Sequence, residues 1–141
     1  MIVLDTNVLS ELMKPRPSMA VVRWVDARSV ASLYTTSLTE AELLHGIALL
    51  PNGKRRDAID AAARAMFEEE LAGRVLPFGS AAARAYAEIA AARRRAGRPI
   101  ATIDAQIAAI VRATGATLAT RNVSDFDGCG IDVANPWSAA G

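Results

Sequence analysis

The stretch from Ile2 to Asn7, Ile-Val-Leu-Asp-Thr-Asn, places a carboxylate, a hydroxyl and an amide directly after a short apolar run. Three branched apolar residues have the length of a short buried strand, and Val8, Leu9 and Leu12 follow at helical spacing. In an open α/β sheet, ligands bind beyond the carboxyl ends of the strands, so Asp5 is a candidate site residue. The alternative is that Asp5 or Asn7 merely caps the next helix.

Outward from this stretch, short apolar strands alternate with helices. We predict strands at residues 2–4, 33–36, 74–78, 116–120 and 131–134. The helices between them are expected to end near Pro15, Ala27, Pro51, Leu71, Gly97 and Gly115. Such alternation implies right-handed crossovers and a mostly parallel sheet that is covered on both faces, which is the α/β class.

Two helix starts are predicted from side-chain capping. Ser37 and Glu40 match the capping box, in which the hydroxyl caps the helix and the carboxylate reaches back to the cap residue. Thr102 is expected to cap a later helix, which carries Ile103, Ile107 and Ile110 on one side.

Composition limits the classes of protein that remain. The 141 residues are expected to form a single domain, 1–141, and a net charge of +1 excludes a global attraction to polyanions. Cys129 is the only cysteine, so an intrachain disulfide is impossible and a reducing compartment is favoured. With no signal peptide pattern and no apolar stretch of membrane-spanning length, we expect a cytoplasmic protein without a membrane role.

Further polar residues occupy positions like that of Asp5. Glu42 shares a helical side with Leu38 and Leu49, and a carboxylate in an apolar neighbourhood needs a partner or a metal. Asp104 lies in the first turn of its helix, where the helix dipole alone would explain it. Just past the fourth predicted strand lie Thr120, Asn122 and Asp125, although an Asp in such a turn is commonly a turn residue.

Taken together, the carboxylates predict a cation site. Carboxylates that converge at one sheet end repel each other and take up protons unless a cation neutralises them. An all-oxygen set suits Mg²⁺ or Mn²⁺, and the sequence has no Cys/His spacing for Zn²⁺. Such ions suit phosphodiester hydrolysis, because metal charge stabilises the attacking and leaving oxygens.

The sequence resembles the PIN-domain ribonucleases, in particular their VapC-type and FitB-like toxins. The resemblance extends over the whole chain, in order, and rests on four segments: Ile2 to Asn7, Ser37 to Gly46, Pro99 to Ala108 and Ala119 to Phe126. It implies a three-layer α/β/α sandwich, Mg²⁺- or Mn²⁺-dependent endoribonuclease activity and a homodimer. It also implies a VapB/FitA-like antitoxin that blocks the site and joins in binding operator DNA.

Site residues follow from the resemblance by position. It implies that Asp5, Glu42 and Asp104 form the acidic core, with Thr6 and Thr120 as supporting hydroxyls. Many relatives carry Asp where this chain has Asn122, so the fourth charge is either supplied by Asp125 or absent. The expected metal ligands are therefore Asp5, Glu42, Asp104 and Asp125, with Asn122 adding at most a neutral oxygen.

Two other functions stay open at this point. An Asp-dependent phosphatase of the haloacid dehalogenase type also begins with an Asp after a strand, but it places a second Asp where this chain has Asn7. A non-catalytic binding module would use the arginine cluster Arg93, Arg94, Arg95 and Arg98 as its surface. In the nuclease interpretation, the same cluster and Arg121 are candidates for RNA contact.

Overall fold

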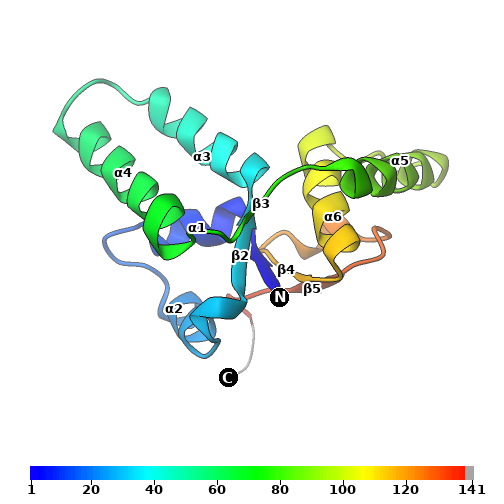
Figure 1. Cartoon of the computed structure of the whole chain (residues 1–141), viewed down its shortest axis with the longest axis horizontal. Coiled ribbons are helices and arrows are strands. Elements are labelled where there is room, and N and C mark those ends of the chain that lie inside the picture. The colour runs from blue at the N-terminus through cyan, green and yellow to red at the C-terminus, as the bar shows by residue number, and fades with distance from the viewer. Residues whose placement is uncertain (139–141) are drawn as a thin grey trace.

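Five parallel strands form the centre of the protein in a computed structural model that describes residues 1–138 (Figure 1). Their order across the sheet is β3-β2-β1-β4-β5. The strands are β1 (Ile2–Leu4), β2 (Leu33–Thr36), β3 (Val75–Leu76), β4 (Thr117–Ala119) and β5 (Asp132–Ala134). All five predicted strands are therefore confirmed, and three of them are shorter than expected.

Helices connect the strands as the sequence predicts. They are α1 (Thr6–Leu12), α2 (Met19–Asp26), α3 (Ser37–Ala48), α4 (Lys54–Ala65), α5 (Ser80–Arg95) and α6 (Thr102–Thr114). Shorter turns are η1 (Val30–Ser32), the π-helical η2 (Met66–Glu70) and η3 (Val123–Phe126). No helix among residues 1–138 is long and apolar enough to cross a membrane.

Helices cover both faces of the sheet, which confirms the three-layer arrangement (Figure 1). Side chains alternate along a strand, so neighbouring residues of β1 enter different cores. Val3 packs with α5 and α6, whereas Leu4 packs with residues of α1 to α4. The same alternation divides Leu118 from Ala119 in β4. Successive residues of the central strands are therefore apolar, as expected for a parallel sheet that is buried on both faces.

The register of β1 and β4 brings distant polar residues to one edge. Leu4 pairs with Ala119, and the Asp5 amide donates to the Ala119 carbonyl at 3.0 Å. Because the two strands are parallel, the residues that follow them, Asp5 and Thr120, leave the sheet side by side. The carboxyl edge of the sheet is thus the place where the predicted site residues meet.

Both predicted capping assignments are wrong by one residue. The N-cap of α3 is Thr36, whose hydroxyl accepts from the Thr39 amide at 3.1 Å, and Ser37 is the first helical residue. β2 runs to Thr36, so the last strand residue already has the extended backbone that a cap requires. The capping box with Glu40 therefore does not form. At α6, Ala101 occupies the N-cap position, and Thr102 is the first helical residue.

Candidate active site

Asp5 caps a helix and lies at the predicted site. The residue is only 6% exposed, although it carries an ionisable group. One oxygen, Oδ1, accepts from the Thr6 amide at 2.8 Å and caps α1, while Oδ2 accepts from the Thr120 hydroxyl at 2.8 Å. The predicted cap is therefore confirmed, and the second oxygen joins the carboxylate to Thr120, the residue that follows β4.

The Thr120 hydroxyl is the centre of a small network. It is fully buried, donates to Asp5, and accepts from the Asn7 amide Nδ2 at 3.1 Å and from the Asn122 backbone amide at 3.2 Å. Asn7 in turn accepts from the Arg121 amide through Oδ1 at 3.1 Å. Asn7 is not among the site residues that the sequence predicts. The available signal was its position two residues after Asp5, where a short amide side chain reaches the same sheet edge.

Glu42 joins the site from α3. The Thr6 hydroxyl donates to its Oε1 at 2.7 Å, so the first residue of α1 holds a carboxylate 36 positions away. Glu42 is half-buried, which agrees with the expectation of a partner. The apolar neighbourhood predicted around it is wrong in one respect: Leu49 is 73% exposed, because it follows the last residue of α3.

The four carboxylates act on one another electrostatically. Burial raises the pKa of Asp5 above its ordinary value; the hydrogen bonds from Thr120 and Thr6 oppose this, and the charges of Glu42 and Asp125 add to it. Burial also raises the pKa of Asp104, and the charges of Asp5, Asp125 and Glu42 raise it further. Asp5, which directly follows β1, therefore lies near enough to Glu42 of α3, Asp104 of α6 and Asp125 of η3 for these charges to act on one another.

Asn122 and Asp125 contribute in different ways. Both are exposed, and Asn122 supplies its backbone amide to the Thr120 hydroxyl. The Asp125 amide donates to the Asn122 carbonyl at 3.1 Å in the η3 turn. Asp125 is thus the one of the two that adds negative charge beside Asp5 and Asp104.

The predicted arginine surface needs one correction. Arg93 is only 7% exposed and donates to backbone carbonyls, so it is not available to contact RNA. Arg94, Arg95 and Arg98 are exposed, and Arg98 lies 3.6 Å from the Asp127 carboxylate. Arg121 is exposed at the edge of the site, with its guanidinium 5.0 Å from the centre of the Trp137 ring.

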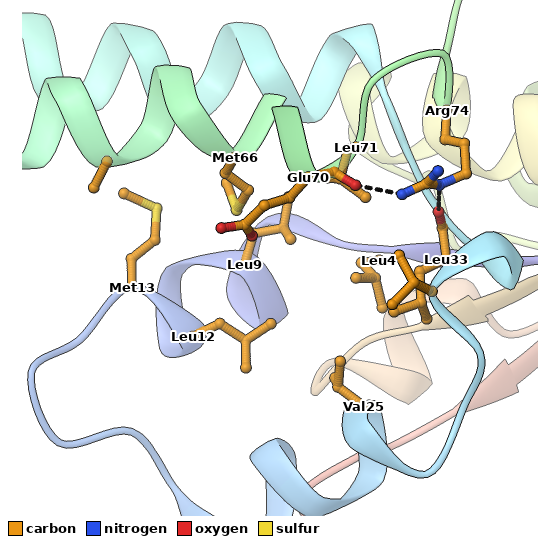
Figure 2. Close-up of a pocket in the computed structure, with 12 residues that line it drawn as sticks. Leu4, Leu9, Leu12, Met13, Val25, Leu33, Met66, Glu70, Leu71 and Arg74 are labelled. Atoms are coloured by element: carbon orange, nitrogen blue, oxygen red, sulfur yellow. Dashed lines mark hydrogen bonds between the residues drawn. The ribbon is translucent and has the colours of Figure 1, made fainter. Parts of the chain in front are cut away.

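A groove of about 590 Å³ adjoins the acidic site between α1, α3 and α4. Its lining includes Thr6 and Glu42 from the site and the basic residues Lys14 and Arg55 at its margin. A separate apolar cavity of about 560 Å³ contains none of the four carboxylates. Figure 2 shows this cavity, at whose rim Arg74 donates to the carbonyls of Leu33 and Glu70.

The chemistry of the acidic donors fits a hard divalent cation. Among residues 1–138, no three His, Cys, Asp or Glu side chains already lie as close together as the ligands of a bound metal ion. Mg²⁺, however, is usually held by one or two carboxylates and keeps several of its waters, so it does not need a closed protein cage. The pKa values of Asp5 and Asp104 are raised by burial and, in addition, by neighbouring negative charges, and a divalent cation stabilises the charged form of such carboxylates.

The fold and the site together define a class of protein: an α/β/α sandwich with an all-oxygen acidic centre at the carboxyl edge of a parallel sheet. The chain belongs to the PIN-domain family: the model of this family, described as "PIN domain", matches residues 2–127. The resemblance inferred from the sequence is thereby confirmed.

Known relatives match over the full length. The VapC ribonuclease Y4jK of Sinorhizobium fredii is 45% identical over 140 residues, covering 99% of this chain and 100% of the relative. Toxin FitB of Neisseria gonorrhoeae is 39% identical over 137 residues, covering 97% and 99%. The solved structure of FitAB bound to an IR36 DNA fragment has a TM-score of 0.93 at 37% identity, covering 100% of this chain and 99% of that one.

Proposed function

We propose that this protein is a divalent-metal-dependent endoribonuclease that acts as the toxin of a toxin–antitoxin pair. The observation that carries the proposal is the meeting of Asp5, Glu42, Asp104 and Asp125 at one sheet edge, where their charges act on one another. Full-length similarity to a VapC ribonuclease and to toxin FitB supports RNA as the substrate and toxin as the biological role.

Each residue has a distinct part in this proposal. Asp5, Glu42 and Asp104 hold Mg²⁺ or Mn²⁺, with Asp125 as the fourth charge. A bound divalent ion supplies the positive charge that activates water and stabilises the oxygens of an in-line displacement at phosphorus. Thr120 keeps the Asp5 carboxylate in place, and Thr6 does the same for Glu42. Oriented ligands of this kind bind metals more tightly than ligands whose partners have been removed.

We infer the partners from the relatives. The similarity to FitAB, whose structure was solved bound to a DNA fragment, supports an antitoxin partner. We infer that this antitoxin covers the active site and joins in binding operator DNA, as the resemblance implies. We further infer a homodimer in the cytoplasm, as the resemblance implies. Arg121 is an RNA-contact candidate whose backbone lies at the site, because its amide donates to Asn7. Its guanidinium, held over the Trp137 ring, is placed to attract a phosphate group.

The decisive experiment is cleavage of a pooled structured RNA by purified, antitoxin-free protein in Mg²⁺, Mn²⁺ or EDTA. We expect cleavage in either metal and none in EDTA. RNA that is bound but never cut would contradict the nuclease and favour the non-catalytic binding module. Cleavage that persists in EDTA would contradict the metal dependence alone.

A second expected result concerns stability without metal. Burial raises the pKa of Asp104 in the folded state. The free energy of unfolding therefore decreases as the pH rises through this pKa, and at neutral pH the ionised carboxylate destabilises the folded protein. Asp104→Asn should therefore raise Tm by a few degrees in EDTA at pH 7. The gain should disappear as the pH falls through the raised pKa towards 3.8, the ordinary value.

Thermal unfolding with and without Mg²⁺ measures this effect. Asp57→Asn is the matched control, because Asp57 is an exposed acid in the first turn of α4 and should give no gain. Mg²⁺ should raise the Tm of the wild-type protein more than that of Asp104→Asn. A lower Tm for Asp104→Asn in EDTA would contradict the crowding of negative charge at this site.

A further inference from the structure

Arg93 stands apart from the arginines beside it on α5. It is 7% exposed, whereas Arg94 and Arg95 are exposed. The ion pairs found within residues 1–138 do not include Arg93, so its charge is buried without a carboxylate partner. Burying a charge is costly unless the group is hydrogen-bonded. The hydrogen bonds of Arg93 therefore indicate its role in the structure.

Those bonds all go to two loop segments. The Nε donates to the Arg98 carbonyl at 2.7 Å, and Nη1 donates to the carbonyls of Asp125 and Asp127 at 2.9 and 3.0 Å. Nη1 also lies 3.7 Å from the buried Cys129 sulfur. The chain wraps closely around the side chain: Gly128 has a φ of +75°, and a Cβ there would lie 3.7 Å from the Arg93 Cδ.

The two segments are those that lead to two of the acids. Arg98 lies in the connection from α5 to α6, and Asp104 is in the first turn of α6. Asp125 itself is in η3, and it is the exposed member of the acidic set. The guanidinium is planar, and its donors have a fixed, forked geometry. Hydrogen bonds from this one side chain to both segments therefore fix the distance between the two segments. The exposed Arg98–Asp127 pair is a second, weaker link between the same segments.

We propose that Arg93 is a positioning residue, which holds Asp125 at the correct distance from Asp104 and so completes the acidic site. The inference rests on the proposed function and deepens it. Arg93 touches neither substrate nor ion; it acts through Asp125, whose charge is felt at both Asp5 and Asp104. A lysine in its place keeps the charge but not the fork, so it cannot hold all three carbonyls in this geometry.

The test is the affinity of the purified full-length protein for Mn²⁺, measured by electron paramagnetic resonance of the free ion, with RNA cleavage as a second readout. Arg93→Lys should weaken Mn²⁺ binding by about 10- to 100-fold, the usual loss when a residue that supports a ligand is changed. Arg94→Lys and Arg95→Lys, the same change at exposed neighbours, should bind Mn²⁺ as tightly as the wild type.

A double-mutant cycle separates positioning from a general structural role. If Arg93 acts through Asp125, Arg93→Lys should add little to the loss already caused by Asp125→Asn. Additive losses, or Mn²⁺ affinity unchanged in Arg93→Lys, would overturn the inference while the nuclease proposal stands. No Mn²⁺ binding by the wild-type protein would overturn both.

Folding is checked by circular dichroism and thermal unfolding of each variant. Should Arg93→Lys not fold, Arg93→Gln replaces it, since a neutral amide retains donors without a buried charge. A folded Arg93→Gln with weakened Mn²⁺ binding that is not weakened further by Asp125→Asn supports the inference. Failure of both variants to fold would contradict it, because Arg93 would then be required for the fold itself.

Discussion

Asp5→Asn is expected to reduce metal-dependent RNA cleavage by about 100- to 1000-fold, the range found when one main electrostatic contact at a reaction centre is lost. Asn is as good an N-cap as Asp, so the bond from the Thr6 amide and the start of α1 should survive. What is lost is the negative charge on a buried group, together with the acceptor of the Thr120 hydroxyl. The fold should therefore persist while activity disappears.

The measurement is single-turnover cleavage in Mg²⁺ and in Mn²⁺, with Tm recorded for each protein. The control is Asp132→Asn, an exposed carboxylate in the first position of β5, at the opposite edge of the sheet from the acids. It should cleave like the wild type. If Asp5→Asn retained full activity, the assignment of the acidic core would be wrong.

Thr120→Val should damage both stability and activity, although the two side chains have nearly the same shape. The hydroxyl is fully buried and makes hydrogen bonds to Asp5, Asn7 and the Asn122 amide. Valine leaves these groups without a partner, and each buried polar group left unpaired costs about 1–3 kcal/mol. Some of them will reach water at the site edge, so we expect a total loss of about 2–4 kcal/mol.

Cleavage by Thr120→Val should fall by about 10- to 100-fold as the Asp5 carboxylate loses its orientation. Urea unfolding and single-turnover cleavage measure the two effects. Thr120→Ser keeps the hydroxyl and should recover most of both, while Thr117→Val, at the start of the strand that Thr120 follows, should change neither strongly. Equal losses in Thr117→Val and Thr120→Val would mean that the network around Asp5 has no special role.

Most of the fold was predictable because each element carries its own local signal. Short apolar runs give the strands, and Pro or Gly residues end the helices, as Gly115 does with a φ of +69° after α6. The helix starts were less predictable, since Thr36 and Ser37 are both good capping residues. The length of β2, which its pairing with β1 and β3 sets, determines that Thr36 and not Ser37 is the N-cap.

The site was partly predictable for the same reason. Asp5 and Thr120 follow apolar strands directly, so their position at the carboxyl edge follows from a parallel sheet. Glu42 and Asp104 lie within helices. The position of Glu42 beside Leu38 predicted that its carboxylate needs a partner, whereas Asp104 was explained by the helix dipole alone and was assigned to the acidic core by the family resemblance. Arg93 had no local signal, because four arginines in six positions look alike until the packing of η3 buries one of them. The roles of these residues remain predictions until the variants are measured.

The pairing of β1 with β4 also has a consequence for synthesis on the ribosome. The ribosome adds Asp5 to the chain 115 residues before Thr120, whose hydroxyl fixes the Asp5 carboxylate. At about 5–20 residues per second, a nascent chain spends roughly 6–23 s without that partner. The central strand of the sheet must likewise wait for β4 before both of its edges are paired. A nascent chain that contains Asp5 but not yet Thr120 therefore lacks the bond that orients the Asp5 carboxylate, and the acidic centre assembles only after β4 and the residues that follow it have been made.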